Sequence, residues 1–160
     1  MRKSIVSPSK TSSSPSSGQG LDQGLDIAQI ASVEISSEDA QHPFENALQG
    51  GKEGGWKAAD PGPQVIRLNF DHPQSIRRIR VEFREQTRER SQEFALFASS
   101  ASFQRRQLVR QQWTFSRGGS AIEVEDFSVD LAGVLSLELE IDPGRHDKQA
   151  IATLESLAIA

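Results

Sequence analysis

The feature that most constrains the fold of this chain is an alternation of apolar and polar residues with a period of two. It is clearest over residues 134–142, where one face carries Leu135, Leu137, Leu139 and Ile141. Successive side chains of a β-strand point to opposite faces of the sheet, so this pattern predicts a half-buried strand in an antiparallel sheet. The same alternation, with more interruptions, predicts strands over residues 64–70, 75–83, 92–100, 107–116, 122–131 and 154–159.

Turn-forming residues stand between these segments, as an all-β fold requires. They are His72-Pro73, Gly118-Gly119, Ala132-Gly133 and Pro143-Gly144. Several strands separated by turns at a spacing of roughly 8 to 12 residues are typical of a sandwich or barrel. Residues 82–93 contain many helix-favouring residues but lack an apolar stripe, so we expect a charged loop there rather than a helix.

The range 122–131 contains a change of phase. One apolar set consists of Ile122 and Val124, and the other consists of Phe127, Val129 and Leu131. If every apolar residue faces the core, one extra residue must be accommodated between the two sets. The sequence therefore predicts a β-bulge near Asp126.

Residues 1–25 are expected to form a disordered, Ser-rich tail. Eight of the first twenty residues are Ser, and the only adjacent apolar pair is Ile5-Val6. Such a segment cannot bury enough apolar surface to offset the entropy lost on ordering. It also lacks the apolar stretch of about 7 to 15 residues that a secretory signal needs, and no run approaches the roughly 18 to 20 apolar residues that span a bilayer. We expect one domain, residues 26–160, in the cytoplasm and away from membranes.

Composition excludes several kinds of site. The 160 residues include no Cys, which removes disulfides, thiolate nucleophiles and cysteine zinc sites. The 18 Lys and Arg residues against 22 Asp and Glu give a formal net charge of -4, so nucleic acid is not an expected partner. The chain has no Gly-x-Ser-x-Gly elbow, phosphate-binding glycine loop or dinucleotide fingerprint. These observations favour a non-catalytic binding module over an enzyme.

A set of short motifs follows in a characteristic order between residues 31 and 68. They are Ala31-Ser32, Ser36-Ser37, His42-Pro43, Glu45-Asn46, Gly55-Trp56-Lys57-Ala58 and Val65-Ile66-Arg67-Leu68. In this order they resemble the start of the galactose-binding-like, or discoidin (coagulation-factor type C), domain family. The resemblance implies an all-β, antiparallel, jelly-roll-like sandwich of about eight strands. It also implies a binding function, because many members bind carbohydrates or lipids.

A narrower resemblance leaves the ligand open. Residues 36–49, SSEDAQHPFENALQ, are similar to the opening of two intracellular members of this fold. One is the N-terminal domain of a DNA-repair scaffold protein, and the other is a subunit of the intraflagellar transport particle. Both are protein-interaction modules. The main expectation is therefore carbohydrate binding, with protein–protein interaction as the alternative; the sequence does not predict an oligomeric state.

The resemblance also raises the question of a structural calcium ion. Many carbohydrate-binding relatives hold Ca²⁺ with an Asp before a Gly and a Glu on the last strand. Here Gln49 precedes Gly50, and Ser156 stands at the Glu position with Glu155 one place away. Calcium needs six to eight oxygen ligands, with carboxylates among them, so calcium is doubtful and we expect no cofactor or metal site. Phe44 is the only strong candidate for the apolar loop spike of lipid-binding members, so membrane binding is not expected.

The strand count places the candidate ligand-binding residues at one end of the sandwich. If each strand crosses the sandwich once, successive loops emerge at alternate ends, and residues 38–63, 84–91, 117–119 and 143–148 share an end. The candidates there are His42, Trp56, Arg84, Arg88, Arg90, Arg117 and His146. Acidic residues lie in the same loops. Mixed charge suits a hydroxyl-rich or protein ligand better than a phosphate backbone.

Each candidate also has a purely structural interpretation. Trp56 follows a glycine pair and is typical of a core residue rather than a sugar-stacking platform. The Arg residues of 84–90 alternate with Glu85 and Glu89, as in a solvated loop with weak ion pairs. His146 lies in the charged sequence RHDK, where a solvated side chain is the simplest expectation.

Overall fold

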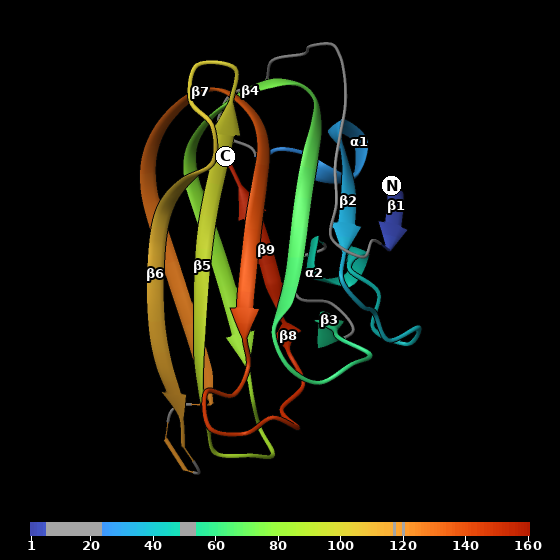
Figure 1. Ribbon diagram of the computed structural model, residues 1–160, viewed down its shortest axis with the longest axis vertical. Helices are drawn as coiled ribbons and strands as arrows, with labels where there is room; N and C mark the ends of the chain where they lie inside the picture. The colour runs from blue at the N-terminus through green and yellow to red at the C-terminus, as the bar shows by residue number, and fades with distance from the viewer. Residues whose placement is uncertain (6–23, 49–53, 117, 120) are drawn as a thin grey trace.

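The computed structural model describes residues 1–5, 24–48, 54–116, 118–119 and 121–160, and the chain is mostly β-structure (Figure 1). The main sheet has the order β1-β2-β4-β7-β5-β6, with β9 paired to β4, and β3 and β8 form a small second sheet. The elements are β1 (Arg2–Ile5), α1 (Ile27–Ile30), β2 (Ala31–Ile35), α2 (Glu45–Leu48), β3 (Trp56–Lys57), β4 (Gln64–Arg84), β5 (Arg90–Ser100), β6 (Arg106–Phe115), β7 (Ile122–Asp142), β8 (Thr153–Leu154) and β9 (Ser156–Ile159). The all-β sandwich expected from the alternation is confirmed.

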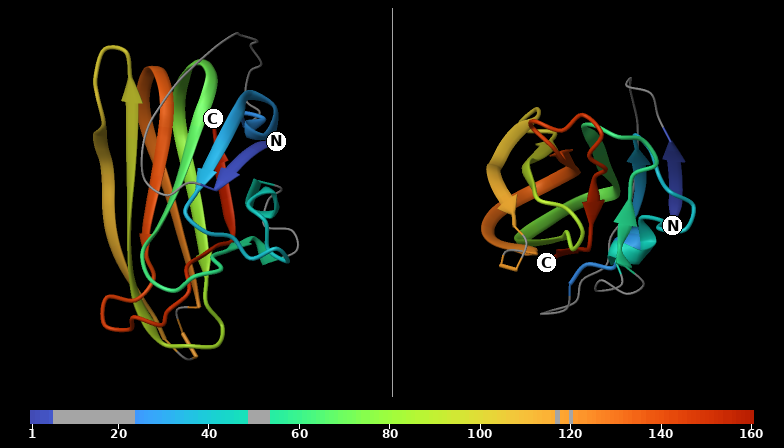
Figure 2. Two further views of the ribbon diagram at one scale, coloured as in Figure 1. Left: turned by 45° about the vertical axis from the view of Figure 1, so that its right-hand side comes forward. Right: turned by 90° about the horizontal axis from the view of Figure 1, so that it is seen from below.

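Two 21-residue strands, β4 and β7, belong to both layers of the sandwich. They pair antiparallel from Gln64 and Ile141 at one end to Arg84 and Ile122 at the other. Both strands fold over at the upper end of Figure 1, where the register shifts between Asn69 and Arg78. The first half of β4 therefore pairs with β2 and its second half with β9. Figure 2 shows the two layers from the side and from below.

The core lies between these two layers. Inward-facing residues of the larger layer include Ile66, Leu68, Leu96 and Leu139, each almost fully buried. The smaller layer covers them with a second apolar set: Ile79, Val81, Phe83, Leu157 and Ile159. The rings of Phe83 and Phe94 lie 5.0 Å apart between centroids, so the layers make close aromatic contact near the lower end.

The register of β7 differs from the expected one. Pairing with β4 runs without a shift from Ser128 to Ile122, so the bulge predicted near Asp126 is wrong. The alternation of Phe127, Val129 and Leu131 instead continues back to Glu123, which is fully buried. A hydrogen bond of 3.2 Å from Gln92 Nε2 to Glu123 Oε2 gives the carboxylate a partner there. No bulge is needed at Asp126, because Gln92 supplies a hydrogen-bond partner for the Glu123 carboxylate inside the core.

The same strand exposes residues that the alternation placed inside. Ile122 and Val124 are 43% and 44% exposed, on the face opposite Glu123. The irregularities lie further along β7: its pairing with β4 shifts between Ser128 and Leu131, and its pairing with β5 shifts between Val134 and Ser136. Leu135 is consequently 37% exposed, whereas Val134 is buried. The prediction that Leu135 shares a face with the core leucines is therefore wrong.

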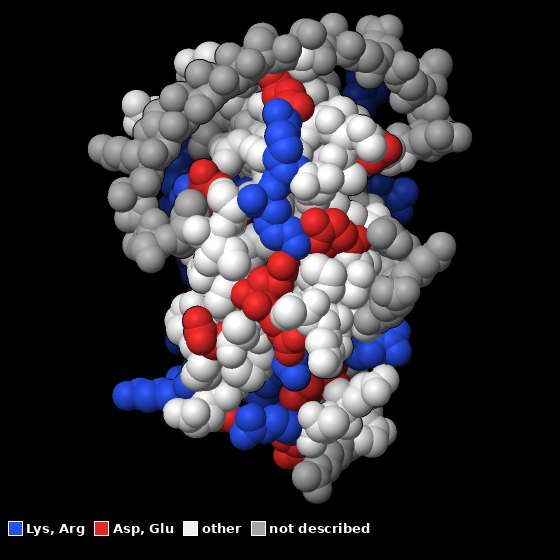
Figure 3. All heavy atoms as spheres, turned by 90° about the vertical axis from the view of Figure 1, so that its right-hand side faces the viewer, with Lys and Arg blue, Asp and Glu red and all other residues white. Residues whose placement is uncertain are grey.

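The N-terminal segment departs from the expected tail. Residues 6–23 lie outside the described residues, but Arg2–Ile5 form β1, which pairs in parallel with β2. Lys3 Nζ donates hydrogen bonds to Glu38 Oε1 at 2.8 Å and to Glu45 Oε2 at 2.6 Å. Backbone pairing and charge thus order a segment that has no apolar face. Figure 3 views this side of the molecule and shows basic and acidic side chains intermixed on it.

Candidate functional site

The loops that the strand count assigned to one end do meet there, at the lower end of Figure 1. They connect β4 to β5, β6 to β7, and β7 to β8. Arg88 Nη2 lies 3.1 Å from Asp147 Oδ2, which joins the first loop to the third. The Glu85 amide donates to the Ala121 carbonyl at 2.8 Å, which joins the first to the second. No helix forms over residues 82–93, as expected, but the charged loop is confined to residues 85–89, because 82–84 belong to β4 and 90–93 belong to β5.

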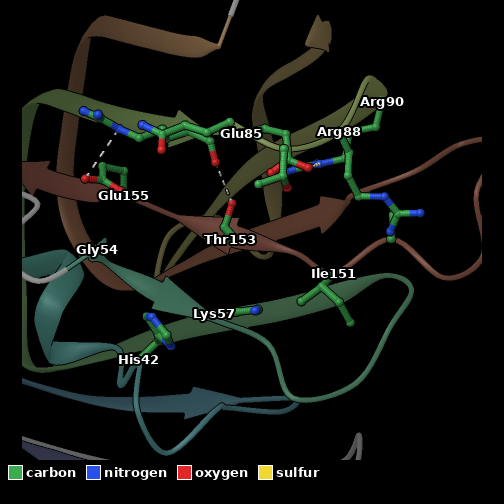
Figure 4. A pocket seen from close by; sticks show the side chains of 13 residues that line it. His42, Gly54, Lys57, Glu85, Arg88, Arg90, Ile151, Thr153 and Glu155 are labelled. Atoms are coloured by element: carbon green, nitrogen blue, oxygen red, sulfur yellow. Dashed lines mark hydrogen bonds and ion pairs between the residues drawn. The ribbon is translucent and has the colours of Figure 1, made fainter. Parts of the chain in front are cut away.

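A cavity of about 500 Å³ opens at this end, next to the small sheet (Figure 4). Four segments line it: the turn at His42, strand β3 with Lys57, residues 84–90, and residues 150–155. We call it the loop-end cavity. Its lining combines charged groups with the apolar side chain of Ile151 and the hydroxyl of Thr153.

Glycine geometry places β3 against this cavity. Gly54 and Gly55 have φ values of 80° and 65°, in the left-handed region that favours glycine. A Cβ on Gly55 would lie 2.3 Å from the Leu154 carbonyl oxygen, so only glycine lets the chain approach β8 so closely. Trp56 and Lys57 then pair with Leu154 and Thr153. Because side chains alternate along a strand, Trp56 enters the core and Lys57 faces the cavity.

Several polar groups in the cavity wall have weak or no partners. The Lys57 side chain is partly buried, and its ammonium makes no hydrogen bond or ion pair with the described residues. The Lys57 amide donates to the His42 carbonyl at 3.1 Å, which fixes the two residues side by side. His42 Nδ1 has no hydrogen-bond partner within the described part of the chain, and Asp39 Oδ2 lies 3.8 Å away.

The structure brings together four of the seven predicted site residues. His42, Arg84, Arg88 and Arg90 all line the loop-end cavity. Trp56 has no exposed surface, so it cannot stack on a ligand, and its assignment to the site is corrected to a core role. His146 is exposed in the β7–β8 connection and is not part of the cavity lining, whereas Arg117 lies outside the described residues.

Arg90 lines the cavity but is committed to the protein. Its side chain is only 2% exposed, and Nη1 donates to the Pro143 carbonyl and to Gln92 Oε1, both at 2.8 Å. The guanidinium also lies over the Phe115 ring, 4.8 Å from its centroid. Arg90 therefore holds the β4–β5 and β7–β8 connections together. The charge pattern of residues 84–90 predicted a solvated loop residue and did not indicate this buried role.

A buried polar cluster of Arg90, Gln92 and Glu123 lies behind the cavity. Gln92 accepts from Arg90 and donates to Glu123, which links the cavity wall to β7. Burial raises the pKa of Glu123 to about 7, against the opposing effects of the Gln92 hydrogen bond and the Arg90 charge. Burial also lowers the pKa of Arg90, against the attraction of Glu85.

Sequence reasoning missed Lys57, Thr153 and Glu155, which also line the cavity. Lys57 belongs to the motif Gly55-Trp56-Lys57-Ala58, and the direction of its side chain could have been predicted from strand geometry. A residue that directly follows a core tryptophan in a strand must face the other way. β8 has only two residues, so alternation alone gives no signal for Thr153.

The described residues do not fit a calcium site of the kind considered above. They contain no group of three or more His, Asp or Glu side chains that could hold a metal ion. Glu155 faces Arg84, with 3.7 Å between Oε1 and Nε, and Ser156 is buried. Gln49 and Gly50 lie outside the described residues. The absence of a cofactor stays a prediction.

Two observations bear on membranes. Phe44 is fully buried in the core, so it is not an apolar loop spike. Within the described ranges, no helix has the length and apolar character needed to cross a bilayer.

The folded-over sandwich and its loop-end cavity define a domain of the galactose-binding-like class. The solved structures that resemble it include the family 32 carbohydrate-binding module of C. perfringens NanJ in complex with galactose. That likeness has a TM-score of 0.61 at 13% identity and covers 85% of this chain and 96% of the module. A pectin-binding carbohydrate-binding module gives a TM-score of 0.58 at 22% identity, with coverage of 82% and 90%. At these identities the likeness shows the fold alone.

The profile of the XRCC1 N terminal domain family matches residues 24–112, which is more than half of the chain. The protein therefore belongs to the XRCC1 N terminal domain family. The structure of reduced XRCC1 bound to the DNA pol beta catalytic domain agrees, with a TM-score of 0.54 at 14% identity and coverage of 79% of this chain and 91% of that one. No curated protein matches the sequence.

Proposed function

We propose that this domain is a non-catalytic module that binds carbohydrate in the loop-end cavity. The observation that carries the proposal is the cavity itself, where the partly buried Lys57 side chain lies beside His42 and has no ion pair with the described residues. Its volume of about 500 Å³ lies within the range of small-molecule sites, roughly 300 to 1,000 Å³. Similar modules are described in complex with galactose and with 4,5-unsaturated mannuronic acid, which supports the same class of ligand here.

The chemistry of the lining suits a sugar. Lys57 and Arg84 supply N–H donors, whereas Glu85 and Glu155 supply carboxylate acceptors for hydroxyl groups. Ile151 adds apolar surface that can contact the C–H face of a sugar ring. The lining provides donors, acceptors and an apolar contact within one cavity, which a hydroxylated ring needs for binding.

Isothermal titration calorimetry of the whole chain against galactose and galacto-oligosaccharides tests the proposal. We expect saturable binding that His42→Ala weakens about tenfold, the effect of one lost hydrogen bond to a polar ligand. His146→Ala is the matched control, because His146 lies at the same end but outside the cavity lining. We also expect a chelator to leave binding unchanged. If well-folded protein shows no binding in these titrations and none on a broad glycan array, the proposal is rejected.

Membership of the XRCC1 N terminal domain family favours a second candidate, a protein-interaction module. XRCC1 itself is described bound to the DNA pol beta catalytic domain. In this chain β6 is the last strand of the main sheet, and Ile122 and Val124 expose apolar surface on β7. If a partner binds to this apolar surface of β7, the double variant Ile122→Lys/Val124→Lys should abolish the crosslinked complex with that partner, whereas His42→Ala should leave the complex intact.

A further inference from the structure

A continuous chain of side-chain hydrogen bonds connects the loop-end cavity to the core. Arg90 Nη1 donates to the Pro143 carbonyl in the β7–β8 connection and to Gln92 Oε1, both at 2.8 Å. The nitrogen of the same carboxamide, Gln92 Nε2, donates to Glu123 Oε2 at 3.2 Å. Gln92 and Glu123 have no exposed surface, whereas Arg90 lines the cavity (Figure 4). A change at Glu123 therefore reaches the cavity wall through two side chains.

Both charged members of this chain have an unused atom. Arg90 Nη2 and Glu123 Oε1 are buried and make no hydrogen bond with the described residues. The first is a donor, and the second is a full acceptor only when the carboxyl group is ionised. A neutral Glu123 carries its hydrogen on Oε1, because Oε2 accepts from Gln92. The two unused atoms are therefore complementary in the ionised state and not in the neutral state.

The other groups that face Glu123 leave Arg90 as the positive charge that acts on it. In the described part of the chain, Arg90 and Glu125 are the charged side chains that influence its ionisation. Glu125 accepts from Gln111 of β6 at 2.7 Å, and the residue paired with Glu123 on β4 is Phe83. Burial, as described above, raises the pKa of Glu123 to about 7. The neutral form therefore prevails in mildly acidic solution, and the ionised form prevails above neutrality.

Arg90 is bonded to the loop end in the observed arrangement. Its Nε lies 3.4 Å from Glu85 Oε1, and its Nη1 bonds to the Pro143 carbonyl. The guanidinium is planar and rigid, so Nη2 reaches Glu123 Oε1 only if the whole group moves towards the core. That movement lengthens the contacts with Glu85 and Pro143. The β7–β8 connection then loses one of its attachments to the β4–β5 connection.

We propose that Glu123 and Arg90 form a pH-sensitive switch that sets the order of the loop end. With Glu123 neutral, Arg90 stays on the Pro143 carbonyl and holds the β7–β8 connection. With Glu123 ionised, Arg90 turns to the carboxylate and the connection loosens. It does not detach, because Arg88 still pairs with Asp147 at 3.1 Å. The cavity wall is most ordered in mildly acidic solution, whatever ligand the cavity binds.

An NMR titration of the whole chain from about pH 5 to about pH 8 tests the switch without a ligand. The carboxyl carbon signal of Glu123 reports its ionisation, and the Nε signal of Arg90 reports movement of the guanidinium. We expect both signals to change with one midpoint. Trp113, which pairs with Gln92 across β5 and β6, holds a further unpartnered buried donor, its Nε1. If the indole signal follows Glu123 while the Arg90 signal stays constant, the proposal is overturned.

Hydrogen exchange measures the consequence at the loop end. After correction for the intrinsic pH dependence of exchange, we expect amide protection over residues 144–147 to fall about tenfold from pH 5 to pH 8, the effect of one lost hydrogen bond. Exchange through local opening does not respond to low concentrations of urea, whereas exchange through global unfolding does. A fall that appears only in urea-sensitive exchange reflects global destabilisation and contradicts the switch.

Variants assign the pH dependence to one group. Glu123→Gln keeps the shape of the side chain and cannot ionise, so protection at pH 8 should equal that at pH 5. Asp130→Asn removes an exposed acid from the same strand and is the matched control, which should keep the wild-type dependence. A dependence that persists in Glu123→Gln belongs to another group, such as His146 in the same connection, and overturns the proposal. If Glu123→Gln does not fold, the titration of the wild-type protein still decides.

Discussion

At the scale of single residues, the interior of this sandwich contains an unusual acid. Glu123 is fully buried, and only one of its carboxylate oxygens has a hydrogen-bond partner among the described residues. Desolvation disfavours the charged form of such a group. The pKa of Glu123 is therefore raised to about 7, so that the side chain changes charge near neutral pH.

The raised pKa of Glu123 predicts a specific dependence of stability on pH. Between the ordinary pKa of 4.5 and about 7, the folded protein binds more protons than the unfolded chain. The free energy of unfolding therefore falls as pH rises through this window, by up to about 3 kcal/mol for this group. Glu123→Gln should remove that part of the fall, as measured by urea denaturation at pH 5 and pH 8. Asp130→Asn, an exposed acid on the same strand, is the control; an unchanged pH slope in Glu123→Gln contradicts the prediction.

The sequence predicted several positions in the candidate site because they depend on strand parity. His42, Arg84 and Arg88 share one end of the sandwich because each half of the folded-over strand β4 crosses the sandwich once. Burial was harder to predict. The burial of Trp56 and Arg90 depends on contacts with residues far away in the sequence. The burial of Glu123 contradicts the assumption that the apolar residues of a strand face the core and its polar residues face solvent. The sequence alone gave no signal for this burial, because Glu123 and Glu125 precede Phe127, Val129 and Leu131 in the same phase of the strand.

At the scale of elements, alternation predicted the long strands and missed the short ones. β5 and β6 appear within two residues of their expected limits, because each has enough residues to show a period. β3 and β8 have two residues each, so no period exists in either. β1 has four residues but no apolar face, and it depends on pairing with β2.

Lys3 should account for much of the order in β1. Its side chain is 21% exposed, and its ammonium bonds to two carboxylates, those of Glu38 and Glu45. We expect Lys3→Ala to cost about 1 kcal/mol locally, which corresponds to a roughly fivefold loss of amide protection over residues 2–5. Hydrogen exchange measures this loss. Arg2→Ala is the control: Arg2 pairs with Asp71 at the surface, is 66% exposed, and should change protection much less. Equal effects would show that the Lys3 contacts do not hold the strand.

At the scale of the whole molecule, the pairing of β4 with β7 sets the folding problem. The paired residues are separated by 38 positions at one end, Arg84 to Ile122, and by 77 at the other, Gln64 to Ile141. Loops of this length must close before either layer gains its core. Such non-local pairing is typical of β-sandwiches that fold slowly.

We therefore expect refolding in milliseconds to seconds, the range of all-β domains dominated by non-local contacts. Stopped-flow dilution from denaturant, followed by tryptophan fluorescence, measures the rate, since Trp56 becomes fully buried on folding. A refolding time of microseconds would contradict this expectation and point to local structure as the nucleus.

The bends in β4 and β7 also affect how such a domain acquires new specificities. Each layer continues into the other through these two strands, so their register is fixed by residues remote from the loop-end cavity. The connections at the opposite end can then change in length and sequence without disturbing either layer. The binding loops can therefore change while the two layers of the sandwich stay the same. For protein engineers, the domain offers an end that accepts grafted loops and a frame that needs no redesign.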